Sequence, residues 1–160
     1  VACNGNFGTA SCMDCGRTAD AVAVKETIVQ HGKATVCQRK HCDGYVKPDI
    51  VFFGEGLPHK FHNSLKKDLR EADMVLILGT SLQVAPVSMI PDMVSDTCKR
   101  VLLNRELVGD LDLDDSDRDV FHAGDCDDTI LKLAALLEWQ EDLQEWNARV
   151  QGSVHAGGKE

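Results

Sequence analysis

Two closely spaced pairs of cysteines lie near the start of this 160-residue chain. Cys12 and Cys15 are separated by two residues, and Cys37 and Cys42 by four. Four thiolates on two such loops can surround one Zn²⁺ ion as a tetrahedron. A Cys-x-x-Cys pair can also form a disulfide or exchange electrons, but the redox use requires a strand-to-helix turn that the sequence does not supply here. We therefore predict a zinc site, with His41 as an alternative ligand in a Cys3His set.

The net negative charge of the chain bears on which kinds of molecule it could bind. The chain carries 17 basic and 26 acidic residues, a net charge of −9, which argues against direct binding to nucleic acid or an anionic membrane. A lysine-rich protein segment would instead be attracted. No apolar run approaches the roughly 20 residues that span a bilayer, and no secretory signal is evident. Seven cysteines, an odd number, favour metal ligation over a disulfide framework. We expect an intracellular protein, in the cytoplasm, nucleus or mitochondrion.

The pattern of apolar residues predicts two regions of different character. Residues 1–48 are expected to be irregular, apart from a short β-like stretch at 26–30. The next predictions are buried strands at 49–53, 73–79, 100–104 and 119–124, and helices at 61–72, 86–94 and 127–150. Pro91 should shorten the second helix, and Asp127 or Asp128 should cap the third, which is long enough to be broken. The last ten residues are expected to form a frayed tail.

This alternation predicts an α/β fold, with part of a Rossmann-like parallel sheet covered by helices on both faces, together with a small zinc-binding lobe. The expected ranges are 1–48 for the zinc lobe, 49–139 for the Rossmann-like portion and 140–160 for a final helix and tail. Ligands of such sheets bind where the strands end. The segments that follow the predicted strands are 54–58, 79–84, 104–109 and 124–127.

Several side chains in these segments could bind a nucleotide. Gly79 permits close approach of the backbone, and the hydroxyls of Thr80 and Ser81 can bond phosphate or ribose oxygens, although many strand-end turns have this composition. The sequence Asn-Arg-Glu at 104–106 suits ribose hydroxyls, but it equally suits a solvated turn. Cys126 could face a ligand or be a small buried residue. The acidic run at 110–119 lacks the Gly and Glu of a calcium loop, so we interpret it as a solvated loop.

Taken together, these motifs resemble a sirtuin of the eukaryotic deacetylase type. After the four cysteines come "VKPDIVFFGEGLP" at 46–58, "GTSLQV" at 79–84, "LLNRE" at 102–106 and "GDCDDTILKLAALLEW" at 124–139, in the order typical of that family. The similarity extends from Val1 to about Trp139.

The resemblance implies an enzyme that removes acetyl groups from protein lysines with NAD, releasing nicotinamide and O-acetyl-ADP-ribose. It also implies one structural zinc ion. The residues implied for NAD are Gly79, Thr80, Ser81, Asn104, Arg105, Glu106 and Cys126. Those implied for the acetyl-lysine peptide are Val51, Phe52, Phe53, Gly54, Glu55, Leu82, Gln83 and Val84. The peptide would pair as an extra strand between segments 54–56 and 82–84.

The sequence departs from the family pattern in two ways. We expect the N-terminal half of the family core, with its glycine-rich phosphate loop, to lie outside these 160 residues. The family has His-Gly-x-Phe before the first zinc cysteine, and that histidine is the general base, whereas this chain has "NGNF" with Asn4 in its place. An amide does not titrate near pH 7. The chain alone is therefore expected to be nearly inactive, and a non-catalytic module that binds acyl-lysine or ADP-ribose is the alternative.

Overall fold

The computed structural model describes residues 1–114 and 117–156, with side chains placed up to residue 150. The chain divides into two compact units, Val1–Asp68 and Leu69–Glu160, each with its own sheet. The division falls inside helix α2 (His59–Glu71), which confirms the helix predicted at 61–72. This division into units is based on compactness, whereas the predicted ranges 1–48, 49–139 and 140–160 were based on expected function. Those ranges therefore stay predictions.

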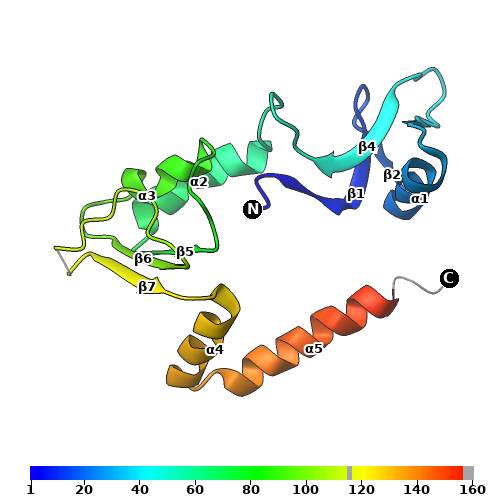
Figure 1. The fold of residues 1–160 in the computed structure, drawn as a ribbon. Coiled ribbons are helices and arrows are strands. Elements are labelled where there is room, and N and C mark those ends of the chain that lie inside the picture. The colour runs from blue at the N-terminus through cyan, green and yellow to red at the C-terminus, as the bar shows by residue number, and fades with distance from the viewer. Residues whose placement is uncertain (115–116, 157–160) are drawn as a thin grey trace. The chain divides into compact units, whose positions relative to one another are not determined.

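The first unit is built on a four-stranded antiparallel sheet (Figure 1). Its strands, in the spatial order β2-β1-β4-β3, are β1 (Gly5–Cys12), β2 (Thr18–Ala19), β3 (Thr35–Val36) and β4 (Tyr45–Ile50). Cys12 pairs with Val46 across β1 and β4. The expectation of a mostly irregular segment at 1–48 was wrong, because strands that pair over a long sequence separation depend on their neighbours more than on local pattern.

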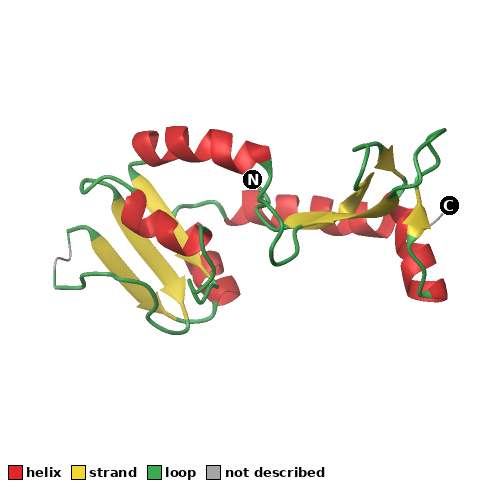
Figure 2. Ribbon diagram, turned by 90° about the horizontal axis from the view of Figure 1, so that it is seen from above, coloured by secondary structure: helices red, strands yellow, loops and turns green. Residues whose placement is uncertain are grey.

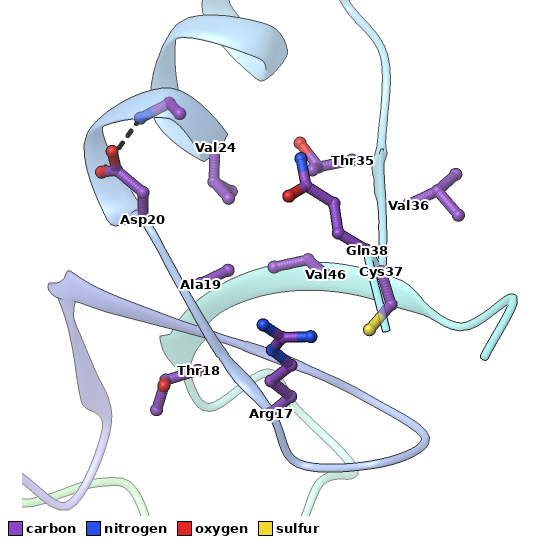
Figure 3. Close-up of a pocket in the computed structure, with 11 residues that line it drawn as sticks. Arg17, Thr18, Ala19, Asp20, Val24, Thr35, Val36, Cys37, Gln38 and Val46 are labelled. Atoms are coloured by element: carbon purple, nitrogen blue, oxygen red, sulfur yellow. Dashed lines mark hydrogen bonds between the residues drawn. The ribbon is translucent and has the colours of Figure 1, made fainter. Parts of the chain in front are cut away.

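Helix α1 (Ala21–His31) also lies in this unit, where the sequence predicted a β-like stretch at 26–30. The Asp20 carboxylate accepts hydrogen bonds from the first turn (Figure 3), and Gly32 ends the helix in the left-handed conformation at φ 60°. Val24 is fully buried in the core of the unit. These two caps and the burial of Val24 outweigh the β preference of the residues at 26–30.

The segment 49–53 does not form the strand of the parallel sheet that the sequence predicted. Strand β4 ends at Ile50, and it pairs antiparallel in the first unit rather than entering a parallel sheet. Phe52 and Phe53 follow it in a turn and are 55% and 94% exposed. The prediction of a buried strand here was wrong, since the apolar run does not pack into a core.

The second unit contains a parallel three-stranded sheet (Figure 2). Its strands, in the order β5-β6-β7, are β5 (Met74–Leu78), β6 (Lys99–Asn104) and β7 (Asp119–Ala123), as predicted. Ile77, Leu102 and Phe121 lie in register across the three strands, and Leu102 is fully buried. Only Ile77 of β5 is buried, so this strand is less covered than the apolar pattern predicted.

The helices of this unit depart from the predictions mainly at their ends. They are η1 (Val87–Met89), α3 (Ile90–Met93), α4 (Cys126–Leu136) and α5 (Gln140–Ala156), and α3 and α4 lie on opposite faces of the sheet (Figures 1 and 2). Asp125 rather than Asp127 or Asp128 caps α4. The long helix breaks at Glu138, where φ is 59°.

Two other predicted segments, the C-terminal tail and the acidic loop, are described only in part. Helix α5 continues through residues 151–156, where a frayed tail was expected, and residues 157–160 lie outside the described part of the chain. The acidic segment at 110–118 is irregular wherever it is described, with 115 and 116 outside that part. Among the described helices, none has the length and apolar character to cross a membrane.

Candidate functional site

The four cysteines predicted to bind zinc meet in the first unit. Their sulfur atoms all lie within 4.8 Å of one another. The Sγ atoms of Cys12 and Cys42 are 3.7 Å apart, as are those of Cys15 and Cys37. Zinc–sulfur bonds of about 2.3 Å in a tetrahedron place the sulfurs about 3.8 Å apart. The cluster therefore has the donor set and spacing of a structural zinc site, and His41 is not part of it.

The backbone turns around the cluster hold the thiols in place. The Gly16 N–H donates to the Cys12 carbonyl at 3.0 Å, which closes the first turn. Gly44 is buried beside the second, and a Cβ there would lie 2.8 Å from the Cys12 sulfur. Only glycine fits at this position without displacing a ligand. The core of the unit otherwise consists of a few small side chains around Val24 and Val46, so a metal ion would supply much of its stability.

The electrostatics of the cluster also fit a cation. A hydrogen bond from the backbone of Arg17 lowers the pKa of the Cys15 thiol to about 6. The backbone of Gly44 likewise favours the Cys42 thiolate, but the neighbouring thiols, Cys15 above all, outweigh it and raise the pKa of Cys42 to about 12. Four sulfurs this close resist joint ionisation unless a positive ion offsets their repulsion.

Asn4 lies in the turn that leads into β1, and its side chain is exposed. Its carbonyl accepts a hydrogen bond from the Val51 N–H at 2.9 Å, which fixes its backbone against the end of β4. Gly5 follows at φ 72°, and a Cβ there would lie 1.8 Å from the Asp49 carbonyl oxygen. The position of Asn4 is therefore set by backbone contacts rather than by its amide.

The segment expected to flank acetyl-lysine, residues 51–55, folds back on itself in the same unit. The Glu55 carboxylate accepts from the Phe52 N–H at 2.9 Å and pairs with Lys47 Nζ at 3.1 Å. These contacts, the Phe52 bond first, lower the pKa of Glu55. Lys47 Nζ also lies 5.0 Å from the centre of the Phe52 ring. Glu55 is thus an internal anchor of this segment, whereas Phe53 is exposed.

In the second unit, the loops after the three parallel strands surround one cavity of about 500 Å³, here called the loop cavity. All seven residues implied for NAD line it: Gly79, Thr80, Ser81, Asn104, Arg105, Glu106 and Cys126. Gln83, expected to face the peptide, lines it as well, whereas Leu82 and Val84 do not. This common lining follows from the parallel order of the strands, which brings their carboxyl ends to one edge of the sheet.

Short contacts fix the segments around the loop cavity. The Asn104 amide donates to the carbonyls of Thr80 at 3.1 Å and Glu106 at 2.9 Å, joining two of the loops. Cys126 Sγ lies 3.3 Å from the Leu103 carbonyl, which ties the start of α4 to β6. A Cβ at Gly79 would lie 3.3 Å from the same sulfur. Cys126 therefore packs against two strand ends as well as lining the cavity.

Three further residues line the loop cavity that the site prediction did not name: Val108, Asp125 and Asp127. Of these, Asp125 forms an ion pair with a residue of the predicted site, because its Oδ2 lies 2.6 Å from Arg105 Nη2. A signal for it was present in the sequence, where "GDCD" follows a strand as the loops of such sheets do. The hydroxyls, amides and carboxylates of this cavity are the groups that bind ribose and other polyhydroxylated ligands.

The first unit contains a smaller cavity of about 270 Å³, which lies between α1 and the sheet (Figure 3). Its polar lining comes from Arg17, Thr18, Asp20, Thr35 and Gln38. The Thr35 hydroxyl is buried and has no hydrogen-bond partner among the described residues. This cavity is distinct from the cysteine cluster, since the lining includes Cys37 alone of the four ligands.

The chain is similar in sequence to one known protein family and to several of its members. The family model described as the Sir2 family matches residues 1–86. NAD-dependent deacetylase sir2D of Dictyostelium discoideum is 39% identical over 141 residues, which cover 87% of this chain and 25% of that protein. NAD-dependent protein deacetylase hst2 of Schizosaccharomyces pombe is 38% identical over 144 residues, covering 90% and 42%. NAD-dependent protein deacetylase sirtuin-2 of Danio rerio is 43% identical over 119 residues, covering 65% and 31%. The chain spans less than half the length of these relatives.

Proposed function

The chain belongs to the Sir2 family, and we propose that the protein containing it removes acetyl groups from protein lysines in a reaction that consumes NAD. The observation that carries this proposal is the loop cavity, in which every residue implied for NAD lines one space. The relatives named above are all NAD-dependent deacetylases, which supports the same reaction here.

We assign NAD binding to residues of the second unit, and zinc and acetyl-lysine binding to residues of the first. In the second unit, Thr80, Ser81 and Glu106 offer hydroxyls and a carboxylate for ribose and phosphate oxygens. The bond from Asn104 to the Thr80 carbonyl keeps the first two loops at a fixed spacing, so these groups are preorganised. When bound, NAD supplies the acceptor for the acetyl group and nicotinamide as the leaving group.

The first unit supplies the zinc site and the segment proposed to contact acetyl-lysine. Four cysteine ligands leave no open position on the metal, so its role is to hold β1 and β4 rather than to activate a substrate. These strands fix Asn4 and the turn at 51–55. The exposed ring of Phe53 offers an apolar surface for the methylene groups of an acetylated lysine.

The substrate proposed is an acetylated protein segment that binds in extended form through backbone hydrogen bonds. The net charge of −9 favours targets rich in lysine over nucleic acid or an anionic membrane. We also propose an intracellular location, because the cysteines are placed for metal binding rather than for disulfides.

The test is an assay on the full-length protein with an acetyl-lysine peptide. Nicotinamide and deacetylated peptide should form in equal amounts, and only when both NAD and peptide are present. Deacetylation at full rate without NAD would contradict the proposal. A peptide with unmodified lysine is the matched control, and it should release no nicotinamide.

A second function, a non-catalytic module that binds acyl-lysine or ADP-ribose, is favoured by one observation. Asn4 stands where the family has its general base, and an amide cannot accept the proton. Calorimetry with ADP-ribose and with the acetylated peptide, combined with the nicotinamide assay above, separates the two functions, since a module would bind a ligand and release no nicotinamide.

A further inference from the structure

The charged groups that line the loop cavity are unbalanced. Among the described residues of its lining, Arg105 is the one cationic side chain, against the carboxylates of Glu106, Asp125 and Asp127, which leaves a formal charge of −2. A dinucleotide bound at the strand ends of such a sheet places its ribose beside an acidic residue, which accepts a bond from the 2′-hydroxyl. Sites that take a 2′-phosphate instead present a free arginine. The question is therefore whether Arg105 is free.

Arg105 is occupied by Asp125. Its Nη2 lies 2.6 Å from Asp125 Oδ2, and the pair lowers the pKa of Asp125. The other oxygen of the same carboxylate, Oδ1, accepts from the Asp127 N–H at 3.1 Å. Asp125 therefore holds Arg105 and caps helix α4 at once.

The second group that could attract a phosphate is the start of α4, which lies at the same cavity. Helix N-termini bind phosphate through free N–H groups and a positive dipole end. Here the Asp125 cap takes up one such N–H, and Asp127 and Asp128 add negative charge to the first turn. A guanidinium and a helix N-terminus are the two features that could bind a 2′-phosphate here. The carboxylate of Asp125 is bonded to both.

We infer that Asp125 makes this cavity select NAD over its 2′-phosphorylated form, NADP, by holding Arg105 and closing the N-terminus of α4. The inference rests on the proposed function, because it takes the loop cavity to be the NAD site. It assigns a specificity role to a residue that binds no part of NAD in the proposal above. Removing the carboxylate should free Arg105 to pair with a 2′-phosphate.

The test compares dissociation constants for NAD and NADP, measured by calorimetry on the full-length protein. Asp125→Ser is the main variant, because serine caps a helix well but carries no charge. Asp125→Asn is the second variant, which keeps the cap with a different side chain. Asp128→Ser is the matched control, since it removes one carboxylate from the same turn at a residue that does not line the cavity. Thermal unfolding should show that all three variants remain folded.

We expect the preference for NAD over NADP to fall about fivefold in both Asp125 variants, because the Arg105–Asp125 pair is largely exposed, and to stay within about twofold in Asp128→Ser. Adding Arg105→Gln to Asp125→Ser should abolish the gain in NADP binding. An unchanged preference in both Asp125 variants, or an equal change in the control, would overturn the inference while NAD binding still supports the proposed function. Absence of NAD binding in the wild-type protein would instead overturn the proposed function and this inference with it.

Discussion

Arg100 on β6 and Asp119 on β7 form an ion pair inside the second unit, with Arg100 Nε donating to Asp119 Oδ1 at 2.7 Å. The two residues are only 5% and 3% exposed. The guanidinium also donates to the Pro91 carbonyl and the Asp92 carboxylate, and Asp119 accepts from the Asp112 N–H at 2.7 Å. The pair thus joins two strands to α3 and to the acidic loop that precedes β7.

Removing one partner should destabilise this unit strongly. Asp119→Asn removes the buried counter-ion of Arg100 and leaves it only the more exposed carboxylate of Asp92, so we expect the free energy of unfolding to fall by about 3 kcal/mol. Urea denaturation at pH 7 measures the change. Asp114→Asn, at an exposed position of the same loop, is the control and should stay within about 0.5 kcal/mol of the wild type. Equal stability of the two variants would show that the ion pair does not stabilise the unit.

The same pair predicts how stability depends on pH. Arg100 holds the pKa of Asp119 below its usual range. A carboxyl with a lowered pKa in the folded state stabilises fully above its unfolded pKa of about 3.9, and this stabilisation is lost as pH falls through the folded value. The stability difference between wild type and Asp119→Asn should therefore be constant at neutral pH and shrink below about pH 4. Urea denaturation at a series of pH values measures this difference, and a loss beginning near pH 6 would point to a different group.

Gly5 should tolerate no side chain. Its φ is 72°, and a Cβ added there would lie 1.8 Å from the Asp49 carbonyl oxygen, which would force β1 away from β4. We expect Gly5→Ala to lower the free energy of unfolding by about 3 kcal/mol or more. Gly56→Ala is the control, because a Cβ there meets no atom within 4 Å. Chemical denaturation of both variants measures the difference, and similar stabilities would contradict the strained turn.

The cysteine cluster should bind one zinc ion and depend on it. Cys12→Ser removes a ligand, so we expect the bound zinc to fall well below one per chain and the first unit to unfold. Metal analysis together with circular dichroism checks both effects. Cys3→Ser lies outside the cluster and should retain zinc and structure. Full zinc content in Cys12→Ser would show that another residue completes the site.

Asn4 should limit the rate of the proposed reaction. Restoring histidine, as Asn4→His in the full-length protein, adds a group that titrates near neutral pH, and we expect deacetylation to rise by about 10²–10⁴. Release of nicotinamide with an acetyl-lysine peptide is the measurement. Asn4→Gln keeps an amide and should remain slow. If the histidine variant is no faster than the glutamine variant, the binding-module function gains support.

Local sequence determined much of the site. The spacing of Cys12, Cys15, Cys37 and Cys42 predicted a metal cluster because four thiols on two short loops can meet only around a small centre. The apolar runs at β5, β6 and β7 predicted parallel strands, and the segments after them predicted where a nucleotide would bind. Both patterns are local, since a pair of metal ligands or the end of a strand involves only a few neighbouring residues.

Tertiary structure decided the rest. The pairing of β1 with β4, the helix at Ala21–His31 and the exposure of Phe53 depend on contacts between residues far apart in the sequence, which no local pattern records. The same holds for Arg105 and Asp125, which are brought to 2.6 Å by the order of β6 and β7. The sequence by itself named the loops of the site. Only the packing of the sheet showed which of their charges face one another, because electrostatic partners are set by distance in space and not along the chain.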